Sequence, residues 1–214
     1  MDKLTTAIIL AGGEGRRIGG QFKWLTVLGT GWTIAQLQLD WLYAAGIDNI
    51  VVTVPVRTRR HQSVDLNGIG HLRSKLVIEA EERPIGDEGG LKRALALVSV
   101  DEVLVMNCDV LTDLNPQEIP PGPALVAVHP RSPWGILVAN GTMLEEKPLL
   151  DIWVSAGIYR LPVSIRSELA DEGMLPELAI PRLLREGRMR VHYHKGFWTA
   201  IETLKDADAY TYGR

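Results

Sequence analysis

A glycine-rich turn with two basic residues follows the first apolar run of the chain. Residues 7–10 are apolar, residues 10–18 read LAGGEGRRI, and Lys23 comes six positions after Arg17. Glycines let backbone N–H groups approach an anion closely, and Arg17 and Lys23 add positive charge to the same turn. The turn is not a P-loop, because no Gly-Lys-Ser/Thr ends it, and its basic residues follow too closely for a dinucleotide fingerprint. The pattern predicts a site for the phosphate groups of a nucleotide.

An aspartate follows a later apolar run in the same way. Residues 103–106 are apolar and lead into Asn107, Cys108 and Asp109. Because ligands of an open parallel sheet bind at the carboxyl ends of its strands, the glycine-rich turn and Asp109 are expected to face one crevice. A carboxylate at that place can hold Mg²⁺ against phosphate oxygens. Asp109 taken alone would be interpreted as a turn residue, but beside a basic turn the metal site is favoured.

Apolar runs and helical patterns alternate along the first half of the chain. The runs at 7–10, 50–54, 76–78 and 103–106 predict strands, and the patterns at 33–45 and 89–98 predict helices. Continuous apolar runs are typical of parallel strands that are covered on both faces. The alternation predicts an α/β fold, a three-layer Rossmann-like domain with a mostly parallel central sheet.

The second half of the chain has a less regular pattern. Extended segments are predicted at 124–128, 152–159 and 189–193, and helices at 178–186 and 204–210. Pro181 is expected to disturb the first of these helices, because proline removes a backbone N–H donor.

Length and composition narrow the class of protein. The 214 residues are expected to form a single domain over residues 1–214. The net charge of −3 gives no support for nucleic acid or a membrane surface as a partner. Cys108 is the only cysteine, which excludes a disulfide framework and favours a reducing compartment. The first residues resemble neither a leader peptide nor a membrane span, so a cytoplasmic location is expected.

Five segments resemble, in order, the motifs of the nucleotidyltransferases that make nucleoside-diphosphate sugars. They are residues 10–23, 84–92 (PIGDEGGLK), 146–148 (EKP), 155–159 (SAGIY) and 197–198 (FW), with residues 107–109 (NCD) as a further similarity. Within this family the motifs resemble those of mannose- and heptose-type guanylyltransferases, such as mannose-1-phosphate guanylyltransferases. The short spacing from Arg17 to Lys23 looks more like molybdopterin guanylyltransferases or inositol-phosphate cytidylyltransferases. The resemblance implies a nucleotide-binding half at about 1–115 and a sugar-phosphate-binding half at about 116–214.

The resemblance also implies a reaction and a set of site residues. A phosphate oxygen of a sugar 1-phosphate would attack the α-phosphorus of a nucleoside triphosphate, and pyrophosphate would leave. Arg17, Lys23 and Asp109 would be catalytic, with Asp109 holding Mg²⁺. The nucleotide would be bound by Leu10, Ala11, Gly12, Gly13, Gly15, Arg16, Pro84 and Gly86, and the sugar phosphate by Asn107, Glu146, Lys147, Ser155 and Gly157. The implied partners are the two small-molecule substrates, and neither nucleic acid nor a membrane is expected as a partner. A homodimer is the oligomeric state that the resemblance suggests.

Two positions depart from the family pattern. Ser155 stands where the family has an asparagine that contacts the sugar, and Ala200 stands where it has a second metal-binding aspartate. Glu202 lies two residues beyond Ala200, on the same side of an extended segment, and is therefore an alternative metal ligand. The other interpretation is that Glu202 is only solvated.

Three functions are compatible with these motifs. The first is a sugar-1-phosphate nucleotidyltransferase, with a preference for GTP and a mannose- or heptose-type sugar. The second, suggested by Ala200, is a regulatory homologue that binds nucleotide or sugar nucleotide but turns it over poorly. The third, suggested by the spacing from Arg17 to Lys23, is nucleotidyl transfer to a non-sugar phosphate such as molybdopterin or inositol phosphate.

Overall fold

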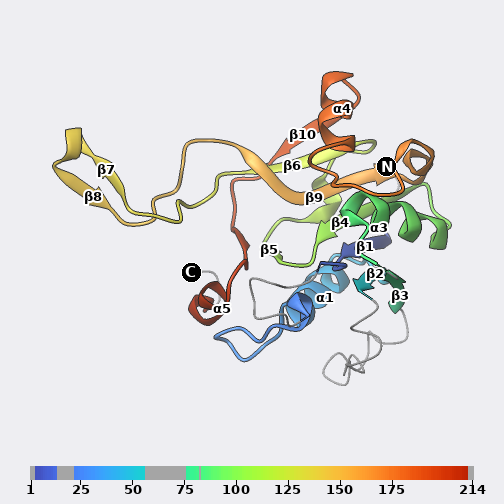
Figure 1. Cartoon of the computed structure of the whole chain (residues 1–214), viewed down its shortest axis with the longest axis horizontal. Helices are drawn as coiled ribbons and strands as arrows, with labels where there is room; N and C mark the ends of the chain where they lie inside the picture. Colours follow the sequence, from blue (N-terminus) through green and yellow to red (C-terminus); the bar gives the residue numbers. More distant parts are fainter. Residues whose placement is uncertain (1–2, 14–21, 56–75, 82, 212–214) are drawn as a thin grey trace.

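A seven-stranded sheet forms the centre of the computed structural model, which describes residues 3–13, 22–55, 76–81 and 83–211. Its order is β3 (Leu76–Glu81), β2 (Asn49–Pro55), β1 (Thr6–Leu10), β4 (Glu102–Asn107), β9 (Val154–Pro162), β6 (Ala124–Val128) and β10 (Arg190–Tyr193). Only β9 runs antiparallel to its two neighbours, and the other pairs are parallel. The predicted mostly parallel sheet is therefore confirmed (Figure 1).

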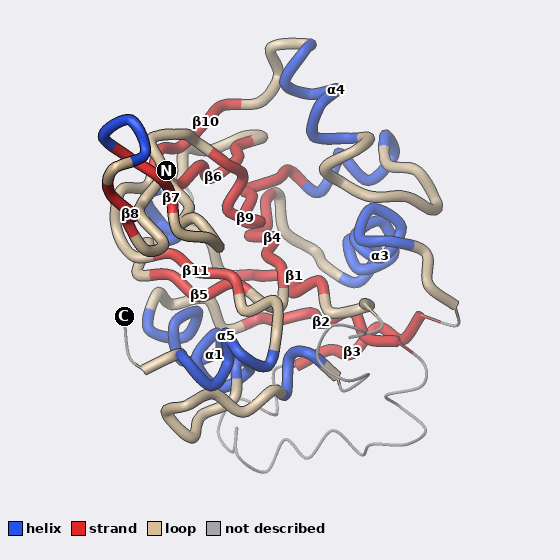
Figure 2. The backbone as a smooth tube through the Cα atoms, turned by 60° about the vertical axis from the view of Figure 1, so that its left-hand side comes forward, coloured by secondary structure: helices blue, strands red, loops and turns tan. Residues whose placement is uncertain are grey.

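Helices cover both faces of this sheet. α1 (Ile34–Ala44) and α5 (Leu204–Ala209) lie on one face, and α3 (Gly86–Ala94) and α4 (Ala179–Arg185) on the other (Figure 2). Successive side chains of a strand point to opposite faces, so Ala7 and Ile9 pack in the core with α1, while Ile8 packs in the core with α3 and α4. The result is the three-layer α/β arrangement that the sequence predicts.

Short elements complete the fold. Two two-stranded sheets are formed by β5 (Val110–Thr112) with β11 (Trp198–Ala200), and by β7 (Ile136–Val138) with β8 (Met143–Glu145). The β7–β8 hairpin projects from the body of the molecule (Figure 1). The 3₁₀ helices are η2 (Lys23–Leu25), η5 (Leu95–Leu97), η6 (Pro116–Glu118), η7 (Ala139–Gly141) and η8 (Val163–Glu168). Within the described ranges, every helix is too short or too polar to cross a lipid bilayer.

Helix ends explain where the structure agrees with the predicted boundaries and where it does not. Thr33 and Gln36 form a capping box at the start of α1, and Gly46 adopts φ = +77° just after its end. The expected disturbance at Pro181 is wrong, because Pro181 is the third residue of α4. The N–H groups of a first helical turn have no intrahelical acceptor, so proline costs no hydrogen bond there.

Candidate active site

The carboxyl ends of β1 and β4 lie side by side. Leu10 is the register partner of Asn107, and the Leu10 carbonyl accepts a hydrogen bond from the N–H of Cys108 at 3.2 Å. The Ala11 N–H donates to both the carbonyl and the hydroxyl of Thr53, at 3.2 and 3.1 Å. The beginning of the glycine-rich turn and the segment that carries Asp109 therefore share one edge of the sheet.

An ion pair joins two of the predicted catalytic residues. Lys23 is the first residue of η2, and its Nζ lies 2.5 Å from Oδ2 of Asp109. Both side chains are largely shielded from water, with exposures of 19% for Lys23 and 20% for Asp109. Charge-assisted hydrogen bonds of this kind are the stronger ones in proteins, and partial burial limits their screening by salt. The predicted residues Gly15, Arg16 and Arg17 lie outside the described part of the chain.

The thiol beside this pair is unsuited to nucleophilic chemistry. Cys108 is buried, and burial raises the pKa of its thiol far above the ordinary value. A neutral, shielded thiol is a poor nucleophile. A covalent intermediate at Cys108 is therefore not expected, and Lys23 and Asp109 are charged side chains that the structure describes at this edge.

The position of the family's second aspartate lies directly beside the Asp109 turn. Ala200 is the antiparallel partner of Val110, and the N–H of Ile201 donates to the Asp109 carbonyl at 2.8 Å. Glu202 is exposed, and its N–H donates to the Asp206 carboxylate at 3.2 Å, just before α5 begins. No group of three or more metal-ligating side chains occurs in the described part of the chain. Asp109 is thus the carboxylate that the strand pairing places at this edge.

The start of β9 brings Ser155 and Gly157, two residues predicted to bind the sugar phosphate, to the same edge. Because β9 runs antiparallel to β4, its amino end lies where β4 ends. Gly157 adopts φ = +69°, and a Cβ atom on it would lie 2.6 Å from Nδ2 of Asn107, so only glycine lets the Asn107 amide pack there. The Gly157 N–H donates to Oγ of Ser155 at 3.3 Å, and that hydroxyl lies 3.2 Å from Oη of Tyr159. The structure brings Asn107, Ser155 and Gly157 together.

Glu146 and Lys147 have a different setting. Both are exposed and follow β8 directly, and Lys147 adopts φ = +48°. The returning chain is tied to residues 131–132, since the Ser132 N–H donates to the Pro148 carbonyl at 2.8 Å. Among the contacts that the structure describes, none joins Glu146 or Lys147 to the Lys23–Asp109 pair. The structure therefore leaves these two predicted acceptor residues at the base of the hairpin.

The predicted nucleotide segment at the start of α3 is tied to the segment before α4. Gly86 adopts φ = +77°, and a Cβ atom on it would lie 2.1 Å from the Gly173 carbonyl oxygen. The buried Glu88 carboxylate accepts N–H bonds from Ala170 at 2.8 Å and Ala179 at 3.1 Å. Gly86 thus has a packing function at this contact, while Pro84 is exposed.

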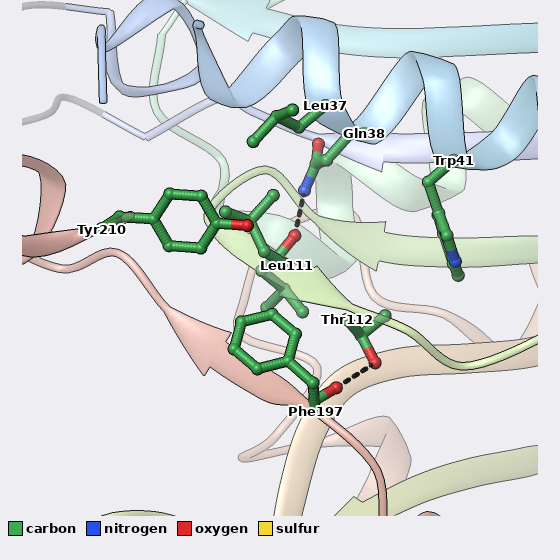
Figure 3. A pocket seen from close by; sticks show the side chains of 8 residues that line it. Leu37, Gln38, Trp41, Leu111, Thr112, Phe197 and Tyr210 are labelled. Atoms are coloured by element: carbon green, nitrogen blue, oxygen red, sulfur yellow. Dashed lines mark hydrogen bonds between the residues drawn. The ribbon is translucent and has the colours of Figure 1, made fainter. Parts of the chain in front are cut away.

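A cavity of about 210 Å³ lies between α1 and β5 (Figure 3). It is lined by Leu37, Gln38, Trp41, Val110, Leu111, Thr112, Phe197 and Tyr210. Within the described residues, neither Lys23 nor Asp109 belongs to this lining. The cavity is therefore distinct from the edge that carries the predicted site, although Gln38 borders both.

Sequence comparisons place the chain among known proteins. Residues 7–117, more than half of the chain, match the MobA-like NTP transferase domain. A mannose-1-phosphate guanyltransferase of Emericella nidulans is 28% identical over 190 residues, which are 79% of this chain and 52% of that protein. The chain thus spans about half the length of the curated relative that it matches.

Solved structures share the fold over nearly the whole chain. HddC from Yersinia pseudotuberculosis superposes with a TM-score of 0.75 and 18% identity, covering 96% of this chain and 98% of that chain. A second crystal structure of HddC is a complex with GMP-PN. The inositol-1-phosphate CTP transferase from T. maritima gives a TM-score of 0.71 with 15% identity, covering 96% of this chain and 92% of that one. These likenesses show a common fold.

Proposed function

The chain belongs to the family of MobA-like NTP transferase domains, and we propose that it transfers a nucleoside monophosphate from a nucleoside triphosphate to a sugar 1-phosphate. An oxygen of the sugar phosphate forms a bond to the α-phosphorus, the bond from that phosphorus to the bridging oxygen of pyrophosphate breaks, and the products are pyrophosphate and a nucleoside-diphosphate sugar. The observation that carries the proposal is the Lys23–Asp109 ion pair at the shared carboxyl edge of β1 and β4.

For this reaction the protein must position the two substrates and neutralise the negative charge of their phosphates. The attacking phosphate is already an anion, so no serine, cysteine or general base is required. Lys23 is assigned to the α-phosphate, where its positive charge offsets the negative charge that develops in the transition state. Arg17, outside the described residues, is assigned to the departing pyrophosphate.

The described residues fit a magnesium ion held mainly by substrate. Mg²⁺ commonly uses one or two carboxylates and completes its shell with water and phosphate oxygens. Asp109 offers one partly exposed carboxylate at the edge where phosphates are expected. When bound, the ion would neutralise part of the triphosphate charge. Glu202 is the second candidate ligand, because Ala200 supplies no oxygen.

The acceptor is assigned to the second half of the chain. Asn107, Ser155 and Gly157 are grouped at the β4–β9 edge and are assigned to the sugar, and Glu146 and Lys147 to the sugar hydroxyls and the acceptor phosphate. In this assignment residues 1–115 bind mainly the nucleotide and residues 116–214 mainly the acceptor, within one domain. A cytoplasmic location, inferred from the lone cysteine, belongs to the same proposal.

GTP and a mannose- or heptose-type sugar are the preferred substrates. The support is the matched mannose-1-phosphate guanyltransferase and the HddC complex with GMP-PN. A weakly active, nucleotide-binding homologue is the second candidate, favoured by Ala200 beside Asp109. Transfer to a non-sugar phosphate acceptor is the third, favoured by the inositol-1-phosphate CTP transferase that shares the fold.

Pyrophosphate release tests these candidates directly. The full chain is assayed with Mg²⁺ and each common nucleoside triphosphate, crossed with a panel of sugar 1-phosphates and inositol 1-phosphate. We expect turnover with one preferred pair and a loss of about 100-fold or more in Asp109→Ala. Asp113→Ala is the matched control, because the Asp113 carboxylate also has a side-chain partner, with Nε2 of His194 2.7 Å from its Oδ1. Nucleotide binding by calorimetry without turnover would instead support the weakly active homologue, and activity confined to Ala200→Asp would locate the missing function at that carboxylate.

A further inference from the structure

One buried glutamine of α1 contacts both segments that carry the ion pair. The Gln38 side chain is 1% exposed. Its Oε1 accepts a hydrogen bond from Nε1 of Trp24 at 2.9 Å. Its Nε2 donates to the carbonyl oxygens of Asn107 at 2.9 Å and Val110 at 2.7 Å. The three partners come from η2, which carries Lys23, and from the turn that carries Asp109.

The hydrogen-bonding capacity of this amide is matched to the turn. A primary amide has two N–H donors and an acceptor oxygen. Nε2 reaches one carbonyl before Asp109 and one after it, so the turn is held at both ends. Figure 3 shows Gln38 directed from α1 toward β5, with its hydrogen bond to the strand marked. Because buried carbonyls left without a donor are costly, the interaction favours one conformation of the turn.

The oxygen of the Gln38 amide contacts the 3₁₀ helix η2, which carries Lys23. Trp24 follows Lys23 directly in η2 and is 2% exposed. Its indole N–H has Gln38 as its partner, so the position of η2 is tied to the same side chain as the Asp109 turn. One amide thereby links the two backbone segments whose side chains meet at 2.5 Å.

We infer that Gln38 is a positioning residue that sets the placement of Lys23 relative to Asp109. The kinetic part of this inference rests on the proposed function, while the structural part does not. A loss of alignment at reacting groups costs much more in rate than in stability, because misplacement by about 1 Å can lower a rate about 100-fold.

Gln38→Met is the main test, since methionine preserves length and packing but removes all three hydrogen bonds. Trp41→Phe is the matched control. Trp41 lies one helical turn further along α1, and its indole N–H donates to the Leu114 carbonyl at 2.8 Å, beyond β5. Both variants remove buried hydrogen bonds between α1 and the same stretch of chain, but only Gln38→Met acts on the Asp109 turn. Both are compared well below their measured Tm values.

The kinetic readout separates positioning from simple destabilisation. We expect Gln38→Met to lower kcat by about 10-fold to 100-fold with a much smaller change in the nucleotide KM, and Trp41→Phe to retain the wild-type kcat. Gln38→Glu adds a pH signature. A neutral carboxyl can donate one hydrogen bond and a carboxylate cannot, so the activity of Gln38→Glu relative to wild type rises as the pH falls. Gln38→Met shows no such rise.

A second readout needs no substrate. The acetylation rate of each lysine by an N-hydroxysuccinimide ester is followed by mass spectrometry. Lys92 is the internal reference, because it also forms an ion pair, with Asp171 at 2.7 Å. We expect Lys23 to be acetylated several-fold faster in Gln38→Met than in wild type, with Lys92 unchanged, and no change at either lysine in Trp41→Phe.

The outcomes distinguish this inference from the proposed function. Equal Lys23 acetylation in Gln38→Met and Trp41→Phe, with equal turnover, would overturn the positioning function. Absence of turnover in the wild type would overturn the proposed function alone, and the acetylation rates would still decide the positioning function. If Gln38→Met does not fold, Trp24→Phe removes the indole N–H together with part of the buried ring system and is expected to change Lys23 acetylation in the same direction.

Discussion

Two residues 86 positions apart in sequence define the candidate site at the residue scale. Lys23 and Asp109 meet because β1 and β4 are adjacent strands that end at the same edge. Two neighbouring positions add to this description. Cys108 is buried and neutral, and Gly157 leaves room for the Asn107 amide. Among the described residues, the candidate site thus combines the Lys23–Asp109 ion pair with the close packing of Gly157 against Asn107.

Gly157→Ala is expected to destabilise the protein and to weaken acceptor binding. A left-handed φ of +69° costs an L-residue about 1–2 kcal/mol, and the new methyl group would also meet Asn107 at 2.6 Å. Gly187→Ala is the control, because Gly187 has φ = +66° but open space around its Cβ position. Thermal unfolding should show a clearly larger decrease of Tm for Gly157→Ala. Equal decreases would mean that the Asn107 contact adds nothing.

At the scale of elements, the sequence predicts the strands and helices that follow from the residue pattern within one segment. The long apolar runs give β1, β2, β3 and β4, and the capping residues give α1. The three-residue strands β5 and β11 were not predicted, because their pairing depends on contacts between residues about 110 and 200. The resemblance assigns Ser155 and Gly157 to the site, but the antiparallel direction of β9 that brings them to this edge was not predicted, since a pattern of apolar residues does not reveal strand direction.

The position of Gln38 in α1 is a sequence signal for a buried polar contact. It stands four residues after Ile34 and four before Leu42, so a polar side chain occupies the buried face of an amphipathic helix. A buried amide must satisfy its hydrogen bonds, and that requirement points to a partner across the core. The identities of the partners, the turn at 107–110 and Trp24, could not be read from the helix alone.

The contact between η8 and the segment that follows α4 makes stability depend on pH. The Arg188 guanidinium donates hydrogen bonds to the Glu168 carboxylate at 2.7 and 2.8 Å and lowers the pKa of that carboxyl. A carboxyl with a lower pKa in the folded state contributes stability above its unfolded pKa of about 4.3, and this contribution is lost as the pH falls through the folded pKa.

Glu168→Gln should therefore be less stable than wild type at neutral pH and equally stable in acid. Because the pair is exposed, the expected decrease of Tm is only about 1–3 °C near pH 7. Glu145→Gln, an exposed carboxylate on the β7–β8 hairpin, is the control and should leave Tm unchanged at both pH values. A difference in Tm that persists at about pH 3 would show that Glu168 acts through packing and not through its charge.

At the scale of the whole molecule, one sheet joins the two halves of the chain. β4 belongs to the first half and β9 to the second, and their antiparallel pairing from Glu102–Pro162 to Met106–Ile158 closes the boundary between them. The family match covers residues 7–117, whereas the solved relatives share the fold across both halves. The first half is thus the more strongly recognisable part, and the second half is where relatives with different acceptors are expected to differ.

Lys147→Ala tests whether the second half of the chain binds the acceptor. Lys147 is exposed and comes two residues after the end of β8, so its removal should leave Tm unchanged. If the second half binds the acceptor, the acceptor KM should rise by about 10-fold to 100-fold, because a charge-assisted contact to phosphate contributes about 1.5–3 kcal/mol, while the nucleotide KM stays near the wild-type value. Lys195→Ala, another exposed lysine of the second half, is the control and should change neither KM. An equal rise of both KM values would instead mean that Lys147 reaches the nucleotide, and the boundary between the two binding functions would then lie within the hairpin and not between β4 and β9.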